Sequence, residues 1–416
     1  MREEIEIMSP AGSFESLASA LKGGANSVYF GIEQLNMRAK SANNFTKDDL
    51  PEIVSRCKEK NVKTYLTVNT ILYDHDISLM KSICDEAKSA GVTAIIASDI
   101  SAISYAHSIG LEVHISTQQN ITNTEAVKFY SQYADVVVLA RELTLKQIKS
   151  ICEDIEKEDI RGPKGDLIQV EIFAHGALCV AISGKCYMSL ATYNSSANRG
   201  ACLQNCRRAY KVIDKETGDE LEIDNQYIMS PKDLCTIGFV DKILDAGVSV
   251  LKLEGRGRAP DYVYVVTKTY REAVDAVLSG TYTKEKIDKW TEDLESVFNR
   301  GFWHGGYYLG KQLGEWSGTY GSQAKTEKIY IGKAVHYFNK AGIGEFMIES
   351  GELSVGDLVL ITGPSTGVAN ASIDELRIDD KPADVAKKGD TKVTFKVKDK
   401  IHRNDKLYKV VERAGV

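Results

Sequence analysis

Five of the eight cysteines lie close together in the sequence, at Cys179, Cys186, Cys202, Cys206 and Cys235. Their spacing is not that of a zinc ribbon, in which cysteines come in close pairs. Thiolates that converge in a reducing compartment can hold an iron–sulfur cluster, form an irregular zinc site or act as a redox relay. The spacing leaves these alternatives open.

The other three cysteines are predicted to be structural. Cys57, Cys84 and Cys152 each stand at helical spacing among apolar residues. A thiol in such a position is usually a small buried hydrophobic side chain.

Three charged residues follow an apolar run near residue 250. Glu254, Arg256 and Arg258 come directly after Val248–Leu253. Charges beside a buried strand are costly unless they are paired or bind a ligand. The planar guanidinium fork suits carboxylates and phosphates. We therefore expect Glu254 and Arg256 to be catalytic and Arg258 to bind substrate. A structural ion pair at the rim of the fold is the alternative.

Further polar residues stand near the ends of other apolar runs or in the segment that holds the cysteines. His175 is predicted to be catalytic, as a proton donor, and a buried structural histidine is the alternative. Amide groups can read a base edge or cap a helix, and arginines can contact phosphate or balance the charge of a cluster. The predicted substrate-binding residues are Arg38, Asn69, Gln118, Arg141 and Arg207.

Eight short apolar runs in the first 260 residues are typical of strands that are buried on both faces. These runs are Ile5–Met8, Ser27–Phe30, Lys63–Thr67, Ala94–Ala97, Glu112–Ser116, Asp135–Leu139, Gln169–Phe173 and Val248–Leu253. Helical patterns lie between most of them: Ser13–Lys22, Lys47–Glu59, Ser78–Ala90, Asp99–Ile109, Thr122–Gln132 and Thr144–Ile155.

This alternation predicts an α/β fold, namely a closed (β/α)₈ TIM-like barrel. An open doubly wound sheet is the alternative, but no Gly-x-Gly-x-x-Gly follows the first strand. Active sites of such barrels lie at the carboxyl ends of the strands. The candidate residues that directly follow strands are therefore expected to meet at one mouth.

The interval between the seventh and eighth strands, about residues 175–241, is far longer than a usual βα loop. Because it is rich in cysteine, glycine and arginine, we interpret it as a functional insertion into a barrel of residues 1–325. Residues 326–416 predict a small antiparallel β-barrel. Its expected strands are Lys328–Phe338, Gly344–Ser350, Gly356–Gly363, Thr391–Lys398 and Asp405–Val411.

The insertion carries a motif that is longer than any of these patterns. Glu171–Ser189 reads EIFAHGALCVAISGKCYMS, and further matching stretches are Asn198–Cys202, Cys206-Arg207, Ser230–Cys235 and Lys252–Arg256. Together they resemble the signature of the collagenase-like peptidase family thirty-two, whose catalytic type is unassigned. The resemblance covers roughly the whole chain.

The resemblance implies more than proteolysis. Relatives hydroxylate tRNA, rRNA or quinone precursors, and the chain looks most like the prephenate-dependent proteins that form 5-hydroxyuridine at the tRNA wobble position. It implies a 4Fe–4S cluster on Cys179, Cys186, Cys202 and Cys235, with Cys206 as the alternative fourth ligand. It also implies tRNA, prephenate as a dicarboxylate co-substrate and the iron–sulfur assembly machinery as partners. The C-terminal barrel resembles the second domain of elongation factors.

Composition narrows the class of protein further. Hydrophobic residues make up 43% and charged residues 26%, which excludes a largely disordered chain. A net charge of −6 excludes a polybasic coat but allows a local RNA-binding patch. The apolar runs are shorter than a membrane span needs, and the N-terminus has no signal-peptide core. We expect a soluble, cytoplasmic protein.

Other functions stay open at this point. A collagenase-like peptidase would need a nucleophile and a base, such as Cys179 with His175. No Gly-x-Ser-x-Gly elbow joins a predicted barrel strand to a helix, and there is no His-Glu-x-x-His helix. A non-enzymatic RNA-binding or assembly factor with structural zinc is a further alternative, as is another RNA or quinone-precursor hydroxylase of the family.

Overall fold

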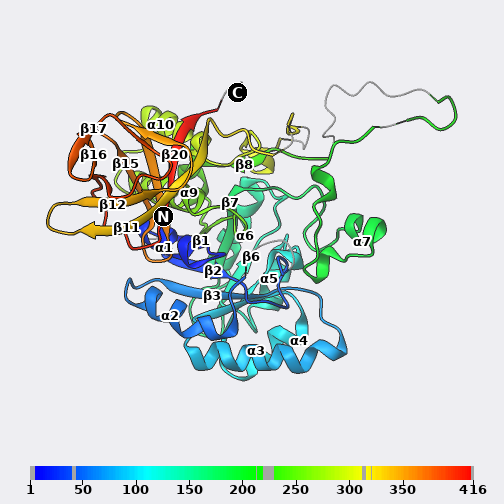
Figure 1. The fold of residues 1–416 in the computed structure, drawn as a ribbon. Coiled ribbons are helices and arrows are strands. Elements are labelled where there is room, and N and C mark those ends of the chain that lie inside the picture. Colours follow the sequence, from blue (N-terminus) through cyan, green and yellow to red (C-terminus); the bar gives the residue numbers. More distant parts are fainter. Residues whose placement is uncertain are drawn as a thin grey trace.

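A closed ring of eight parallel strands forms the larger part of the molecule (Figure 1). The computed structural model describes residues 5–39, 44–211, 213–218, 229–311, 315–319 and 321–413. The ring strands are β1 Glu6–Pro10, β2 Ser27–Phe30, β3 Lys63–Val68, β4 Ala94–Ala97, β5 Glu112–Ile115, β6 Val136–Val138, β7 Gln169–Gly176 and β9 Val250–Leu253. Because β9 pairs with both β1 and β7, the ring closes, and the predicted barrel is confirmed.

Amphipathic helices follow the strands and cover the ring. They are α1 Phe14–Lys22, α2 Leu50–Lys58, α3 Ile77–Ala90, α4 Ile100–Ser108, α5 Thr124–Tyr130, α6 Leu145–Lys157, α8 Val240–Asp245, α9 Pro260–Leu278 and α10 Lys284–Ser296. The hydroxyl of Ser13 caps α1 by accepting from the amide of Ser16. Cys57, Cys84 and Cys152 are buried, as expected for structural thiols.

The chain leaves the barrel after β7 and returns at β8, Asp233–Cys235. Within this segment lie the short helix α7, Met188–Tyr193, and two single-turn helices, Ala197–Arg199 and Asn205–Arg207. In Figure 1, α7 lies to one side of the ring. Residues 212 and 219–228 of the predicted insertion lie outside the described part of the chain.

Two strands that the sequence did not predict extend the barrel sheet. Strand β8 pairs antiparallel with the end of β7 and parallel with β10, Phe302–His304. Each has three residues, which is too short for a periodic pattern to show. Their effect is to add a flap of sheet beside the carboxyl end of β7.

The C-terminal strands are antiparallel, as predicted, and surround a hydrophobic core of their own. Eight form one sheet in the order β15-β14-β20-β11-β12-β19-β16-β17, and β13 pairs with β18. The strands are β11 Thr326–Phe338, β12 Ile343–Ile348, β13 Glu352–Ser354, β14 Leu358–Gly363, β15 Gly367–Ser372, β16 Leu376–Ile378, β17 Lys381–Ala383, β18 Val385–Lys387, β19 Val393–Lys396 and β20 Lys406–Glu412.

This C-terminal sheet packs on the barrel through α1. Lys22 donates to the carbonyl oxygen of Val368 at 2.7 Å and pairs with Asp399 at 2.7 Å. A Cβ atom on Gly367 would stand 2.7 Å from the amide nitrogen of Ser19, so the two backbones are in direct contact. None of the helices in the described ranges has the length and apolar composition needed to cross a membrane.

Replacing Gly367 by alanine tests the packing of the two parts. Gly367 has φ +63°, so alanine costs about 1–2 kcal/mol in backbone strain. The clash with α1 adds to that cost. The matched control is Gly356→Ala, where φ is +91° and a Cβ atom meets nothing within 4 Å. We expect urea denaturation to show a clearly larger loss for Gly367→Ala. Equal losses would contradict a close contact between α1 and β15.

Candidate active site at the mouth of the barrel

A cavity of about 180 Å³ lies at the carboxyl ends of the barrel strands, under the insertion. Its walls combine strand residues, the loops that follow the strands, and four cysteines of the insertion. Six predicted site residues outside the cysteine set line it: Arg38, Asn69, Gln118, Arg141, Glu254 and Arg256. As expected for a barrel of this kind, residues that follow different strands meet at the carboxyl ends of those strands. The cavity is called the cysteine pocket below.

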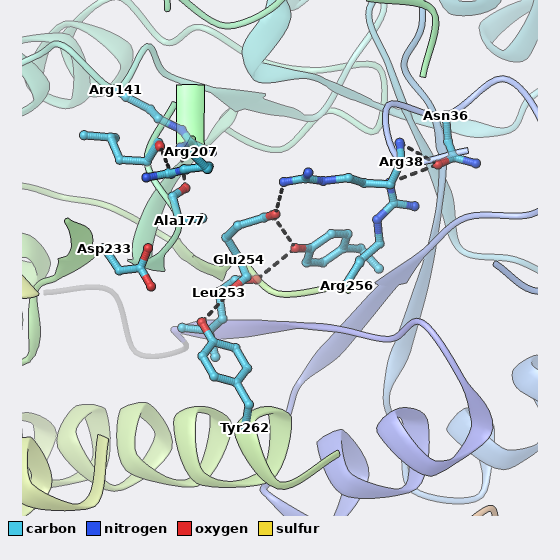
Figure 2. Close-up of polar contacts among 12 residues, drawn as sticks. Asn36, Arg38, Arg141, Ala177, Arg207, Asp233, Leu253, Glu254, Arg256 and Tyr262 are labelled. Carbon is cyan, nitrogen blue, oxygen red and sulfur yellow. Dashed lines mark hydrogen bonds and ion pairs between the residues drawn. The ribbon is translucent and has the colours of Figure 1, made fainter. Parts of the chain in front are cut away.

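Glu254 is the carboxylate of the cysteine pocket. Arg38 reaches it at 2.9 Å and the hydroxyl of Tyr29 donates to it at 3.0 Å. Figure 2 shows Arg38 at the Glu254 side chain, while Tyr262 of α9 donates to the backbone oxygen of Glu254 at 2.8 Å. Burial opposes ionisation, but Arg38 and neighbouring arginines outweigh it and lower the pKa of Glu254 to about 2. Glu254 is therefore a fixed negative charge.

Arg256 is buried and held by neutral acceptors. It donates to the hydroxyl of Thr67 and to the side-chain oxygen of Asn36, each at 3.0 Å. Burial lowers the pKa of Arg256 to about 10, which leaves it charged at neutral pH. Gly31 is required beside it, since a Cβ atom there would stand 2.3 Å from a guanidinium nitrogen.

Two further cations line the pocket. Arg141 lies over the ring of Phe173, with its guanidinium carbon 3.7 Å from the ring centroid, and donates to the carbonyl oxygen of Ala177 at 3.0 Å. Its buried Nε has no hydrogen-bond partner in the described part of the chain. Lys252 pairs with buried Glu171 at 2.7 Å. With Arg38 and Arg256, four cationic groups line the pocket.

The predicted amide residues also line the cavity, but their neighbours already engage them. The side-chain oxygen of Asn69 accepts from the amide of Met37 at 3.2 Å, and its nitrogen donates to Ser116 at 3.3 Å. Ser116 also donates to the side-chain oxygen of Gln118. These hydrogen bonds hold the loops after β2, β3 and β5 together.

Four thiols face the same cavity: Cys179, Cys186, Cys202 and Cys206 all line it. They are close enough for the charge of one to influence another, because the other three thiols raise the pKa of Cys206, after burial as the largest cause. Four thiol donors from one segment fit a thiolate-ligated metal centre in kind. Within the described residues, no three or more metal-binding side chains are already gathered at a metal's distance. Metal binding would therefore require these thiols to converge.

Cys235 and His175 lie outside the lining of the cysteine pocket. They face each other across the β7–β8 pairing, and both are buried. The Nδ1 atom of His175 is 3.4 Å from the hydroxyl of Tyr270, and burial lowers the pKa of His175 to about 3. Burial also raises the pKa of Cys235 to about 12. The short strand β8, which the sequence did not predict, is what separates this pair from the pocket.

Arg207 and Arg258 also lie outside the cysteine pocket. Both line a second cavity on the other side of Cys202 and Gln204. Of the predicted substrate-binding residues, the structure thus brings four to the first cavity and these two to the second.

Sequence reasoning missed several residues of the cysteine pocket. Tyr29, Thr67, Phe173 and Lys252 line it from inside the strands. Lys252 had a usable signal, because a lysine inside a fully buried strand needs a partner. Tyr29 and Phe173 had none, since aromatic residues in strands usually belong to the core.

Comparison of the sequence with known proteins shows which family the chain belongs to. The model of peptidase family U32 matches residues 12–318. A protein named collagenase from Porphyromonas gingivalis is 57% identical, over 99% of this chain and 99% of that protein. The chain belongs to peptidase family U32.

Other U32 relatives carry names of a different kind. The tRNA hydroxylation protein P1 of Bacillus subtilis is 32% identical, over 71% of this chain and 69% of that protein. The 23S rRNA 5-hydroxycytidine synthase of Escherichia coli is 34% identical, over 71% of this chain and 44% of that protein. The family therefore includes both proteins named as peptidases and proteins named for RNA hydroxylation.

The charge of Glu254 predicts a pH dependence of stability. Its pKa is lowered from the ordinary value of 4.5 to about 2, so the stabilisation by its ionised form is complete above about pH 4.5. That stabilisation is lost as the pH falls towards 2. We expect Glu254→Gln to destabilise the protein by about 2 kcal/mol or more at neutral pH. The difference from the wild type should shrink between pH 4.5 and 2, as measured by urea denaturation.

The matched control for this experiment is Glu352→Gln, which changes an exposed carboxylate on β13. It should have a negligible effect across the same pH range. A pH-independent difference between wild type and Glu254→Gln would show that Glu254 is not the paired, ionised group described above.

Proposed function

We propose that this protein is an iron–sulfur-dependent tRNA hydroxylation protein that forms 5-hydroxyuridine at the wobble position, with prephenate as the oxygen donor. The observation that carries the proposal is the content of the cysteine pocket. Four thiols and four cationic side chains surround one cavity at the mouth of a TIM-like barrel. Among its described lining residues there is one carboxylate and no histidine.

The proposed cluster ligands are Cys179, Cys186, Cys202 and Cys206. This set takes Cys206 in place of Cys235, because Cys206 lines the same cavity as the other three and Cys235 is fully buried beside Tyr270. A bound 4Fe–4S cluster would supply redox or Lewis-acid chemistry next to the substrate. Its net negative charge would be balanced by the nearby arginines.

The arginines of the pocket would hold the carboxylates of prephenate. Arg141 has a buried Nε without a partner in the described ranges, so it has a donor to offer. Arg38 and Arg256 are already fixed by Glu254, Asn36 and Thr67, so their charges are preorganised and need little rearrangement on binding. The phenolic hydroxyl of Tyr29 is held by Glu254, and burial and that carboxylate keep its pKa well above the ordinary value, so it acts as a hydrogen-bond donor.

The names of two relatives support the RNA part of the proposal. The Bacillus subtilis and Escherichia coli proteins are named for hydroxylation of tRNA and of 23S rRNA, respectively. Their matches cover 71% of this chain, a length that must include the insertion. The relative of 57% identity is named collagenase, so the names of relatives do not by themselves assign tRNA as the substrate. That part of the proposal also rests on the chemistry of the pocket.

Replacing single cysteines tests the ligand set. After anaerobic purification, we expect the wild type to contain about four irons per chain with a broad visible band. Cys186→Ala and Cys206→Ala should lose both, and a deletion strain that expresses either variant should lack 5-hydroxyuridine in its tRNA. Cys235→Ala should keep its iron and lose about 1 kcal/mol of stability, because it only leaves a small cavity.

The matched control is Cys84→Ala. It removes a buried thiol on α3 that does not line the cysteine pocket, so the variant should keep its iron. Loss of iron in Cys235→Ala with retention in Cys206→Ala would exclude the proposed fourth ligand. Modified tRNA in a strain whose protein has lost its iron would exclude a catalytic role for the cluster. Zinc without iron in the wild type would favour a structural site.

A second candidate function is collagenase-like proteolysis, which the 57% identical relative named collagenase favours. It predicts that metal-free protein, purified free of other proteases, cleaves gelatin. Cys179→Ala should abolish that cleavage if Cys179 is the nucleophile. Gelatin cleavage that persists in metal-free wild type and disappears in Cys179→Ala would replace the hydroxylation proposal.

A further inference from the structure

A second cavity of about 490 Å³ lies beside the cysteine pocket. Four arginines line it, namely Arg207, Arg208, Arg258 and Arg300, and no acidic side chain is found among its described lining residues. The chain as a whole carries a net charge of −6, so this concentration of positive charge is local. It is called the arginine cavity below. A cavity of this kind attracts an anionic ligand.

The arginines are held in place mainly by neutral groups. Arg207 donates to the hydroxyl of Ser230 at 3.1 Å and to the carbonyl oxygens of Pro231 and Leu178 at 2.6 Å each. None of these acceptors carries a charge. Burial lowers the pKa of Arg207, and the charge of Arg300 lowers it further. The positive charge of Arg207 is therefore fixed in position and left uncompensated by its hydrogen bonds.

Arg258 is available to a ligand. Its guanidinium carbon lies 3.5 Å from the ring centroid of Phe298, and no side chain or carbonyl group in the described ranges accepts a hydrogen bond from its guanidinium. Arg300 lies over the same ring at 5.2 Å. Arg300 is paired with Asp233 at 3.4 Å, and this carboxylate does not line the cavity. Phe298 thus contacts two guanidinium groups, of which Arg300 pairs with Asp233 and Arg258 keeps its donors for a ligand.

The arginine cavity and the cysteine pocket share a wall. Cys202 and Gln204 line both of them. A small third cavity, of about 70 Å³, contains Arg38 and Glu254 of the first site together with Arg258 and Arg300 of the second. A ligand can therefore occupy both sites only if it has two parts a short distance apart, one of them anionic.

One exposed aromatic residue, Tyr193, lies next to the arginine cavity. Arg208 donates to the hydroxyl of Tyr193 on α7 and lies over its ring at 5.1 Å. Tyr193 is 49% exposed and Tyr187, at the start of α7, is 72% exposed. Exposed aromatic rings beside arginines are the surface on which unpaired RNA bases stack. A mononucleotide would have no use for this additional surface.

We propose that the arginine cavity binds a backbone phosphate of the RNA, adjacent to the nucleotide whose base enters the cysteine pocket. This inference rests on the proposed function. The guanidinium forks of Arg258 and Arg300 suit phosphate oxygens, and the shared wall suits a nucleotide that joins a base to a phosphate. A small phosphorylated molecule offers the same chemistry, and the test below separates the two sources.

Replacing Arg258 tests the inference, because its side chain makes no hydrogen bond to the described residues and its backbone amide bond to Gly255 is kept in the variant. The probe is an unmodified anticodon stem–loop RNA, and its binding is measured by fluorescence anisotropy at several salt concentrations. We expect Arg258→Gln to weaken binding about 5- to 10-fold and to reduce the salt dependence by about one phosphate contact. Arg258→Lys keeps the charge but loses the planar guanidinium fork. Its affinity for the RNA should therefore lie between those of the wild type and Arg258→Gln.

The matched control is Arg161→Gln, which removes an exposed arginine paired with Asp159, before β7 at the opposite end of the strands. It should bind the RNA as the wild type does. The iron content of each variant is measured in parallel, and an unchanged value shows that the cysteine pocket is intact. A second probe, uridine 5′-monophosphate, is used in the same assay as a competitor.

Three results would overturn the inference. The first is a wild-type affinity and salt dependence in Arg258→Gln. The second is that Arg258→Gln weakens the binding of uridine 5′-monophosphate but leaves RNA binding unchanged. This result would assign the cavity to a small phosphorylated ligand. The third is a wild-type protein that does not bind the RNA. The proposed function is judged separately, by the modified nucleoside in tRNA, so the first two results can leave it standing.

Discussion

The ionised carboxylate of Glu254 is the interaction on which the mouth of the barrel depends. Its cationic neighbour Arg38 comes from the loop after β2, and its hydroxyl partner Tyr29 comes from β2 itself. A charge in this buried position must be paired, so the loop after β2 is tied to the end of β9. Because β9 is also the strand that closes the barrel, ring closure and the assembly of the charged pocket occur together.

The insertion depends on the same residue through its backbone. Gly176 ends β7 with φ +103°, and a Cβ atom there would stand 2.5 Å from the carbonyl oxygen of Glu254. A glycine is thus needed for the chain to turn out of the barrel beside β9. That turn places Cys179 over the mouth, and Arg207 then fixes the segment by donating to Leu178. The two cavities on either side of Cys202 follow from this one exit path.

The sequence was most informative where burial imposed a pattern. The barrel strands are continuous apolar runs because both of their faces are covered, and the residues that follow them lie at one mouth by geometry. Arg38, Arg141 and Glu254 were found in this way. His175 and Cys235 were expected at the same mouth, and their burial outside the cysteine pocket was not predicted, because the three-residue strand β8 gives no periodic signal. Arg300 and Phe298 follow α10, far from the motif, and only the tertiary structure brings them to Arg258.

A shared fold does not decide between the two kinds of name in this family, since chemistry resides in the site. Cysteine proteolysis needs a base close to the thiol, and its conjugate acid must have a pKa near neutrality to work well. His175 precedes the clustered cysteines in the sequence, yet it packs against Tyr270 and Phe302 and has a pKa of about 3. It is therefore a poor general base. The four thiols, in contrast, face fixed cations, which is the environment that favours anionic ligands and a negatively charged cluster.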